Sequence, residues 1–288
     1  MMTATELASR LGLRKSRRDW RGSCPACSYA GAFIVSAGND SRALVRCVSC
    51  GDRDAITDAL QRVTAGSWTP PKRQEAQTEA EARERKQEAA RKCWAGSTTV
   101  TGSLAERYLW SRRLGFLAAS SVLRFRPDTS HPQGGRLPAM VALVTDAADR
   151  PVAVHRTYLS STTAGKADVE PQKASLGPVW GGAIRLARHK PDMPLVIGEG
   201  IESSASAGLL VDAPAWAAIS AGNLAAGLEL PDEVRHVIIA VDPDEPGERA
   251  AQAARRRWTD EGRRVDLIHP VGDGDFNDTL AREMAHGH

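Results

Sequence analysis

The 288-residue sequence predicts an α/β protein built from several modules, and three observations support this fold class. Two Cys-x-x-Cys pairs lie within the first fifty residues, a stretch rich in Ala, Glu, Gln, Lys and Arg follows, and short apolar segments alternate with helical ones after Pro194. Strands that alternate with helices indicate a mostly parallel sheet covered by helices. We therefore expect a cysteine-rich domain at 1–67, a linker helix at 68–94, a basic mixed α+β subdomain at 95–192 and a Rossmann-like domain at 193–288.

Four of the five cysteines form the two pairs, Cys24 with Cys27 and Cys47 with Cys50. Two residues between thiols let one tight turn present both sulfur atoms to a metal ion, and two such turns complete the tetrahedron that structural Zn²⁺ prefers. Disulfides would need an oxidising compartment, but Met1–Leu13 lacks the apolar segment of a secretory signal. The spacing therefore predicts a zinc ribbon with these four cysteines as ligands, in a cytoplasmic protein.

Two segments complete the expected organisation of the N-terminal third. Residues 32–36 and 43–48 have the pattern of a strand hairpin, with a turn at 38–40. Residues 72–94 contain neither Gly nor Pro and carry many opposite charges four positions apart. This composition is typical of an exposed helix, and it supports the predicted linker.

Apolar periodicity predicts the elements of the remaining chain. In the mixed subdomain we expect a helix at 103–113 and apolar strands at 140–144 and 152–159. In the C-terminal domain we expect strands at 195–198, 215–219, 236–241 and 265–268, with helices at 202–210, 224–228 and 247–261.

Charge is distributed unevenly along the chain. Residues 1–73 carry twelve Lys and Arg against six Asp and Glu, whereas residues 193–288 carry eight against seventeen. A basic N-terminal part suits a polyanionic partner, and an acidic C-terminal part suits bound cations. The sequence has no run of about eighteen apolar residues, so we expect no membrane partner.

Acidic side chains follow two of the predicted strands. Glu199 comes directly after the strand at 195–198, and Asp242 and Asp244 come at the end of the strand at 236–241. Because ligands of open α/β sheets bind at the carboxyl ends of strands, we expect these carboxylates at one edge. Mg²⁺ binds through one or two carboxylates together with waters and substrate phosphates. The sequence therefore predicts a magnesium site, which Mn²⁺ could also occupy. Acids after the fourth strand are candidates to close it: Asp273, Asp275 and Asp278.

These residues also carry a family resemblance. Glu199-Gly200 after a strand, Gly222 within residues 219–224, and Asp242-x-Asp244-x-x-Gly247 resemble the three signatures of the Toprim domain, which bacterial-type primases, topoisomerases and certain nucleases share. The cysteine pairs and the Gly51-Asp52 that follows them resemble the N-terminal zinc-binding domain of bacterial and phage primases. Several segments of the middle part are similar to Toprim primases of phages and mobile elements, namely 105–113, 155–159, 166–167, 173–177 and 181–186.

The resemblance implies roles for individual residues. It makes Glu199 the catalytic carboxylate, Asp242 and Asp244 ligands of Mg²⁺, and Asp275 or Asp278 a further metal-binding acid. Positions that resemble contacts to template or incoming nucleotide are Arg136, Arg156, Lys173 and Arg185.

At one position the chain departs from the family pattern. Many primases carry an Asp four residues after the catalytic Glu, where this sequence has Ser203, preceded by Glu202. Either Glu202 takes over the role of the missing acid, or one metal position is weaker.

The function that the resemblance implies is that of a DNA primase, which joins ribonucleoside triphosphates into short RNA primers on a single-stranded DNA template. The sequence contains no Gly-x-x-x-x-Gly-Lys-Ser/Thr motif, so a replicative helicase would act in trans. Two alternatives stay open. One is a Toprim nuclease, which uses similar acids to cut phosphodiesters, and the other is a zinc-dependent single-stranded DNA-binding or regulatory protein with weak catalytic activity.

Overall fold

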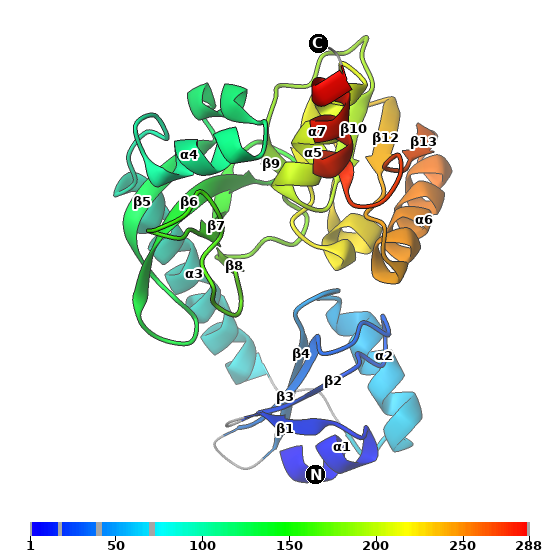
Figure 1. Cartoon of the computed structure of the whole chain (residues 1–288). Coiled ribbons are helices and arrows are strands. Elements are labelled where there is room, and N and C mark those ends of the chain that lie inside the picture. The colour runs from blue at the N-terminus through cyan, green and yellow to red at the C-terminus, as the bar shows by residue number, and fades with distance from the viewer. Residues whose placement is uncertain (1, 17–18, 39–41, 69–72, 287–288) are drawn as a thin grey trace. The chain divides into compact units, whose positions relative to one another are not determined.

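The computed structural model describes residues 2–16, 19–38, 42–68 and 73–286, and the chain divides into two compact units, Met1–Ala82 and Arg83–His288 (Figure 1). The predicted fold class is confirmed, because an antiparallel sheet with the cysteines, a second antiparallel sheet and a mostly parallel sheet follow one another along the chain. No helix in the described ranges is long and apolar enough to cross a membrane. The division into four domains stays a prediction.

The first unit is built on a four-stranded antiparallel sheet in the order β1-β2-β3-β4. Its elements are α1 (Ala4–Arg10), β1 (Arg14–Ser16), β2 (Asp19–Gly22), β3 (Phe33–Ala37), β4 (Ala43–Cys47) and α2 (Arg53–Thr64). Leu7, Phe33 and Leu60 are fully buried and join both helices to the sheet. The hairpin of β3 and β4 is as predicted, although its turn includes residues 39 and 40, outside the described ranges. The sequence patterns did not predict α2.

The linker helix is present as α3 (Arg73–Ala95). The predicted linker began at Trp68, and residues 69–72 lie outside the described ranges. The last turns of α3 belong to the second unit, where Ala90, Cys93 and Trp94 pack against the second antiparallel sheet.

That second antiparallel sheet has the order β5-β6-β7-β8 and is drawn mainly in green in Figure 1. Its elements are β5 (Leu123–Ser130), β6 (Arg136–Thr145), β7 (Pro151–Tyr158) and β8 (Lys173–Leu176), preceded by α4 (Leu104–Ser111) and the short 3₁₀ helix η1 (Gly115–Ala119). The predicted helix and the two predicted apolar strands correspond to α4, β6 and β7. The strands β5 and β8 complete the sheet at its two edges.

The C-terminal sheet has the order β13-β12-β10-β11-β9, with all neighbours parallel except β11 and β9. Its strands are β9 (Ile184–Arg185), β10 (Leu195–Gly198), β11 (Ala215–Ala217), β12 (His236–Ala240) and β13 (Arg264–Ile268). Its helices are α5 (Ile201–Leu210), the π-helical turn η2 (Asn223–Gly227), α6 (Glu245–Asp260) and α7 (Phe276–His286). The four predicted strands are present, and α7 is an additional helix.

Helices cover both faces of this sheet. Val196 of β10 packs with Ala207 of α5 and Phe276 of α7 on one face. Its neighbours Leu195 and Ile197 point to the other face, into a core with α6, whose Trp258 is fully buried. Because both faces are covered, the edge at the carboxyl ends of the strands remains open for a ligand.

Candidate active site and metal centre

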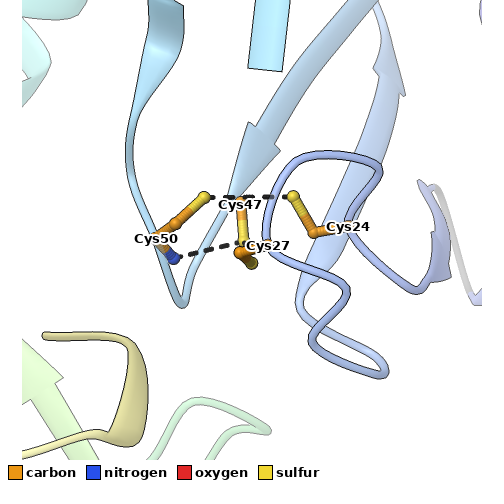
Figure 2. Close-up of side chains that lie close together, drawn as sticks. All are labelled: Cys24, Cys27, Cys47 and Cys50. Carbon is orange, nitrogen blue, oxygen red and sulfur yellow. Dashed lines mark hydrogen bonds between the residues drawn. The ribbon is translucent and has the colours of Figure 1, made fainter. Parts of the chain in front are cut away.

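The four predicted zinc ligands of the first unit converge on one point (Figure 2). Their sulfur atoms lie within 4.8 Å of one another, with 3.9 Å between Cys24 and Cys50 and 3.7 Å between Cys27 and Cys47. These distances exclude disulfides, whose sulfurs lie about 2.05 Å apart. Sulfurs in a zinc tetrahedron with Zn–S bonds of about 2.3 Å lie about 3.8 Å apart, so the cluster fits a structural zinc ion.

In the second unit, a pocket of about 340 Å³ lies at the carboxyl ends of β10 and β12. Glu199 directly follows β10, Asp242 and Asp244 follow β12, and Asp275 directly precedes α7. All four acids line this pocket. The parallel sheet therefore brings together side chains that are up to 76 positions apart in the sequence.

Burial and like charge change the acidity of the pocket. Burial raises the pKa of Glu199 to about 7, and the charges of Asp242 and Asp244 add to this effect. Burial also raises the pKa of Asp242, although the neighbouring Ser203 hydroxyl opposes it. Such raised values mean that the pocket favours a positive charge that can neutralise the acids.

The donors present fit a divalent cation. The Oδ1 atom of Asp242 is buried and has no hydrogen-bond partner among the described residues. The three acids Glu199, Asp242 and Asp244 do not form a closed cage, since among the described residues only the cysteines bring three or more ligand atoms within 4.8 Å of one another. An open set suits Mg²⁺, which completes its shell with waters and phosphate oxygens.

The loop after β12 explains the spacing of the Asp242-x-Asp244-x-x-Gly247 signature. Asp244 is the N-cap of α6, and its carboxylate accepts a hydrogen bond of 2.6 Å from the amide of Gly247. A Cβ atom at Gly247 would lie 2.6 Å from the carbonyl oxygen of Asp242. Only glycine leaves room for this close approach of the helix to the strand end.

In the signature around Gly222, the neighbouring residue Asn223 has a structural role. The buried Asn223 side chain accepts from the amide of Gly181 and donates to the carbonyls of Gly182 and Ala218, at 2.8 to 2.9 Å. Just before it, Ile219 lines the pocket with a φ of +76°, which β-branched residues rarely adopt. The Ile219 amide donates to the carbonyl of Glu199 at 2.8 Å and so fixes the end of β10.

Basic groups from other elements complete the pocket lining. Arg112 follows α4, Lys166 lies between β7 and β8, and Lys173 begins β8. His155 of β7 also lines the pocket, and its Nδ1 lies 3.0 Å from the Ser175 hydroxyl. Burial, together with the charge of Lys173, lowers the pKa of His155 to about 4, so its ring is neutral at physiological pH.

Three of the predicted nucleotide or template contacts do not line this pocket. Arg156 is buried and donates to the backbone carbonyls of Ser130 and Ala174. Arg136 is exposed at the start of β6 and forms an ion pair with Asp128. The guanidinium of Arg185 stacks on the Trp216 ring at 4.3 Å and donates to the carbonyls of Asp146 and Ala147.

The two candidates for the further acid also differ in position. Asp275 lines the pocket, whereas Asp278 is exposed and its carboxylate accepts a hydrogen bond from the amide of Asp275 at 3.0 Å.

Sequence reasoning assigned no role to Arg112, His155 or Lys166, because no spacing rule links them to the acids. Only the family resemblance marked the segments in which they lie.

Two family models match parts of the second unit. Residues 84–186 match the model of a domain of unknown function (DUF7146), and residues 194–286 match the Toprim domain. No curated protein is similar to the chain in sequence.

The chain is similar in fold to solved primase structures. For Aquifex aeolicus primase (zinc-binding and RNA polymerase domains), the identity is 14% over 99% of this chain and 82% of that chain, with a TM-score of 0.46. For the RNA polymerase domain of Mycobacterium tuberculosis primase DnaG, the identity is 15% over 70% of this chain and 82% of that chain, with a TM-score of 0.45. For the primase fragment of the bacteriophage T7 primase-helicase, the identity is 15% over 93% of this chain and 96% of that chain, with a TM-score of 0.42.

Three independent features of the C-terminal part agree. The mostly parallel sheet has helices on both faces, the acids Glu199, Asp242 and Asp244 lie at the carboxyl ends of its strands, and the sequence matches the family model over nearly the whole segment. Residues 194–286 of this chain are a Toprim domain.

Proposed function

We propose that the chain is a DNA primase, which synthesises short RNA primers on single-stranded DNA by cation-dependent nucleotidyl transfer. The observation that carries this proposal is the composition of the Toprim pocket. Acids at the ends of β10 and β12 face the same cavity as Arg112, Lys166 and Lys173. A pocket that offers carboxylates for divalent cations and cationic groups for phosphates suits a nucleoside triphosphate.

The acids have distinct tasks in this proposal. Glu199, whose pKa of about 7 leaves it partly ionised at neutral pH, accepts the proton of an attacking 3′-hydroxyl. Asp242, Asp244 and Asp275 would hold Mg²⁺, which when bound supplies neutralisation of the triphosphate charge. The rigid strand ends keep these groups in place and so reduce the entropy lost on reaching the transition state.

Basic groups of the pocket would bind the phosphates of the nucleotide. Lys166, Lys173 and Arg112 are the candidates for contacts with the triphosphate, because all three line the same cavity as the acids. The neutral ring of His155 adds no charge and offers its Nε2 atom as a hydrogen-bonding group.

The first unit would engage the template. Residues 1–73 have twice as many basic as acidic side chains, and a structural zinc ion at the cysteine cluster would hold the fold of this small unit. A replicative helicase that separates the strands in trans is part of the same proposal.

The test is primer synthesis by the purified full chain on single-stranded DNA of mixed sequence, with Mg²⁺ and labelled ribonucleoside triphosphates. The proposal predicts short RNA products that depend on template and cation. Degradation of the DNA instead would identify a Toprim nuclease. Binding of the DNA with neither reaction would identify a binding or regulatory protein, and either result overturns the primase proposal.

A further inference from the structure

Glu202 lies beside the candidate catalytic acids but has a different environment. It is the second residue of α5, and its side chain is only 8% exposed. One carboxylate oxygen lies 3.0 Å from the Lys173 ammonium, and the other lies 3.3 Å from the Lys166 ammonium and accepts a hydrogen bond from the Tyr108 hydroxyl. We call these four residues the Glu202 cluster.

Both oxygens of Glu202 are therefore already engaged. Burial alone would raise the pKa of Glu202, but Lys173, Lys166 and the Tyr108 hydroxyl hold it below its ordinary value. In return, Glu202 raises the pKa of Lys173 above its ordinary value, although burial by itself would lower it. A carboxylate with two cationic partners and one hydroxyl donor has little capacity left to bind a metal ion.

The cluster joins elements from both parts of the second unit. Tyr108 belongs to α4 and Lys173 to β8, whereas Glu202 belongs to the Toprim domain. The Lys173 ammonium lies close to the start of α5, 3.7 Å from the position that a Cβ atom of Gly200 would occupy. One carboxylate shared by two lysines leaves one positive charge in excess, and both lysines line the Toprim pocket.

The residue after Glu202 has a separate contact. Burial raises the pKa of Asp242, and the hydroxyl of Ser203, which stands where many Toprim primases carry an acid, opposes this rise. Neither Glu202 nor Ser203 thus reproduces the missing acid. Next to this departure from the family pattern lies the buried carboxylate of Glu202, which forms ion pairs with two lysines.

We propose that Glu202 is a positioning residue, which holds Lys166 and Lys173 charged and in place at the pocket wall so that they receive nucleotide phosphates, and that it is not a ligand of the catalytic cations. The part that concerns nucleotide rests on the proposed primase function. The part that concerns the lysines and the cations rests on the geometry of the cluster alone.

The test uses Glu202→Gln in the full chain, since glutamine keeps the shape and removes the charge. Three quantities are measured: the pH at which the ¹³Cε signals of Lys166 and Lys173 titrate, the affinity for ATP in the presence of Mg²⁺, and the affinity for Mg²⁺ alone. Two partly buried ammonium groups without a counter-ion lose their protons more easily, so both signals should titrate at lower pH. ATP affinity should fall about tenfold or more, and Mg²⁺ affinity should not change.

Two further variants control for effects on folding. Tyr108→Phe removes one hydrogen bond but keeps both ion pairs, so it should change the lysine titrations and the ATP affinity less than Glu202→Gln does. Glu202→Asp keeps the charge on a shorter side chain, so at least one lysine signal should titrate near its wild-type pH. If Glu202→Gln does not fold, Glu202→Asp alone distinguishes a positioning residue from a cation ligand. If Glu202 were a ligand of the cations, the shorter side chain would draw its carboxylate away from them and weaken Mg²⁺ binding.

Two results would overturn the inference: unchanged lysine titrations in Glu202→Gln, or a loss of Mg²⁺ affinity as large as the loss of ATP affinity. Failure of the primase proposal gives a different pattern. In that case no primer is made by the wild-type chain, while the lysine titrations of the variants still shift.

Discussion

The amide of Gly247 donates a 2.6 Å hydrogen bond to the carboxylate of Asp244, and this contact sets the distance between α6 and the end of β12. A Cβ atom at Gly247 would come within 2.6 Å of the Asp242 carbonyl oxygen and 3.0 Å of the Asp242 Cβ. The position of both aspartates therefore depends on the absence of a side chain at residue 247.

Gly247→Ala should displace the loop that carries Asp242 and Asp244. We expect a loss of about 1–3 kcal/mol of stability, as is usual for overpacking, and a clear loss of Mg²⁺ affinity. Thermal unfolding and Mg²⁺ titration measure the two effects. Glu248→Gln, at the next position of α6 and about half exposed, is the control and should change neither. Wild-type Mg²⁺ affinity in Gly247→Ala would mean that the loop tolerates the extra methyl group.

Zinc should stabilise the first unit and leave the second unaffected. Cys47→Ser removes one of four converging thiols, so it should release the metal and unfold the first unit, because metal binding contributes about 10 kcal/mol or more in zinc-finger peptides. Metal analysis and limited proteolysis measure the outcome. Cys93→Ser, which alters a thiol outside the cluster, should retain zinc. Wild-type protein purified without chelator and lacking zinc would contradict this account.

The acidity of Glu199 predicts a dependence on pH. Its folded pKa of about 7 lies above its ordinary value of 4.5, so the folded protein holds this proton more tightly than the unfolded chain. Its contribution to stability is thus present at pH 4.5 and below, is lost as the pH rises to about 7, and stays lost above that. Glu199→Gln should remove this pH dependence.

The same proton should compete with a divalent cation. Mg²⁺ affinity of the wild-type protein should fall as the pH drops below about 7, and titration calorimetry in buffers of different ionisation enthalpy should detect the released proton. A Mg²⁺ affinity that is constant between pH 5 and pH 8 would place the cation away from Glu199.

Two predicted basic contacts should respond differently to mutation. Arg156→Gln should lower the unfolding temperature, since the buried guanidinium donates to the carbonyls of Ser130 and Ala174. Lys173→Gln should instead lower nucleotide affinity about tenfold, because its ammonium lines the Toprim pocket. Thermal unfolding and ATP binding separate the two effects. Equal loss of ATP affinity in both variants would mean that Arg156 contributes to nucleotide binding after all.

Local patterns in the sequence were enough to predict the parallel sheet, the cysteine cluster and the acids at the strand ends. Buried parallel strands are continuous apolar runs, and metal-binding cysteines have a fixed spacing, so both can be read without tertiary information. The edge strands β5 and β8 were missed, since most of their residues are exposed or only partly buried and lack a clear apolar alternation.

Tertiary contacts decide what the sequence left open. An arginine that donates to backbone carbonyls, such as Arg156, has the same local pattern as one that lines the pocket, such as Arg112. Likewise, nothing in the sequence indicates that Tyr108 of α4, Lys173 of β8 and Lys166 of the preceding loop converge on Glu202. These relations arise only when the antiparallel sheet packs beside the Toprim domain.

The most direct measurement is primer synthesis on single-stranded DNA by the wild-type chain and by Glu199→Gln, Asp242→Asn and Glu248→Gln. The first two variants alter the pocket, whereas Glu248 interacts with Gln252 and His269 outside it. The account predicts template-dependent RNA primers from the wild type and from Glu248→Gln, and losses of about a hundredfold or more in the two pocket variants, with zinc content unchanged. Primer synthesis at near wild-type rate by Glu199→Gln and Asp242→Asn would contradict it.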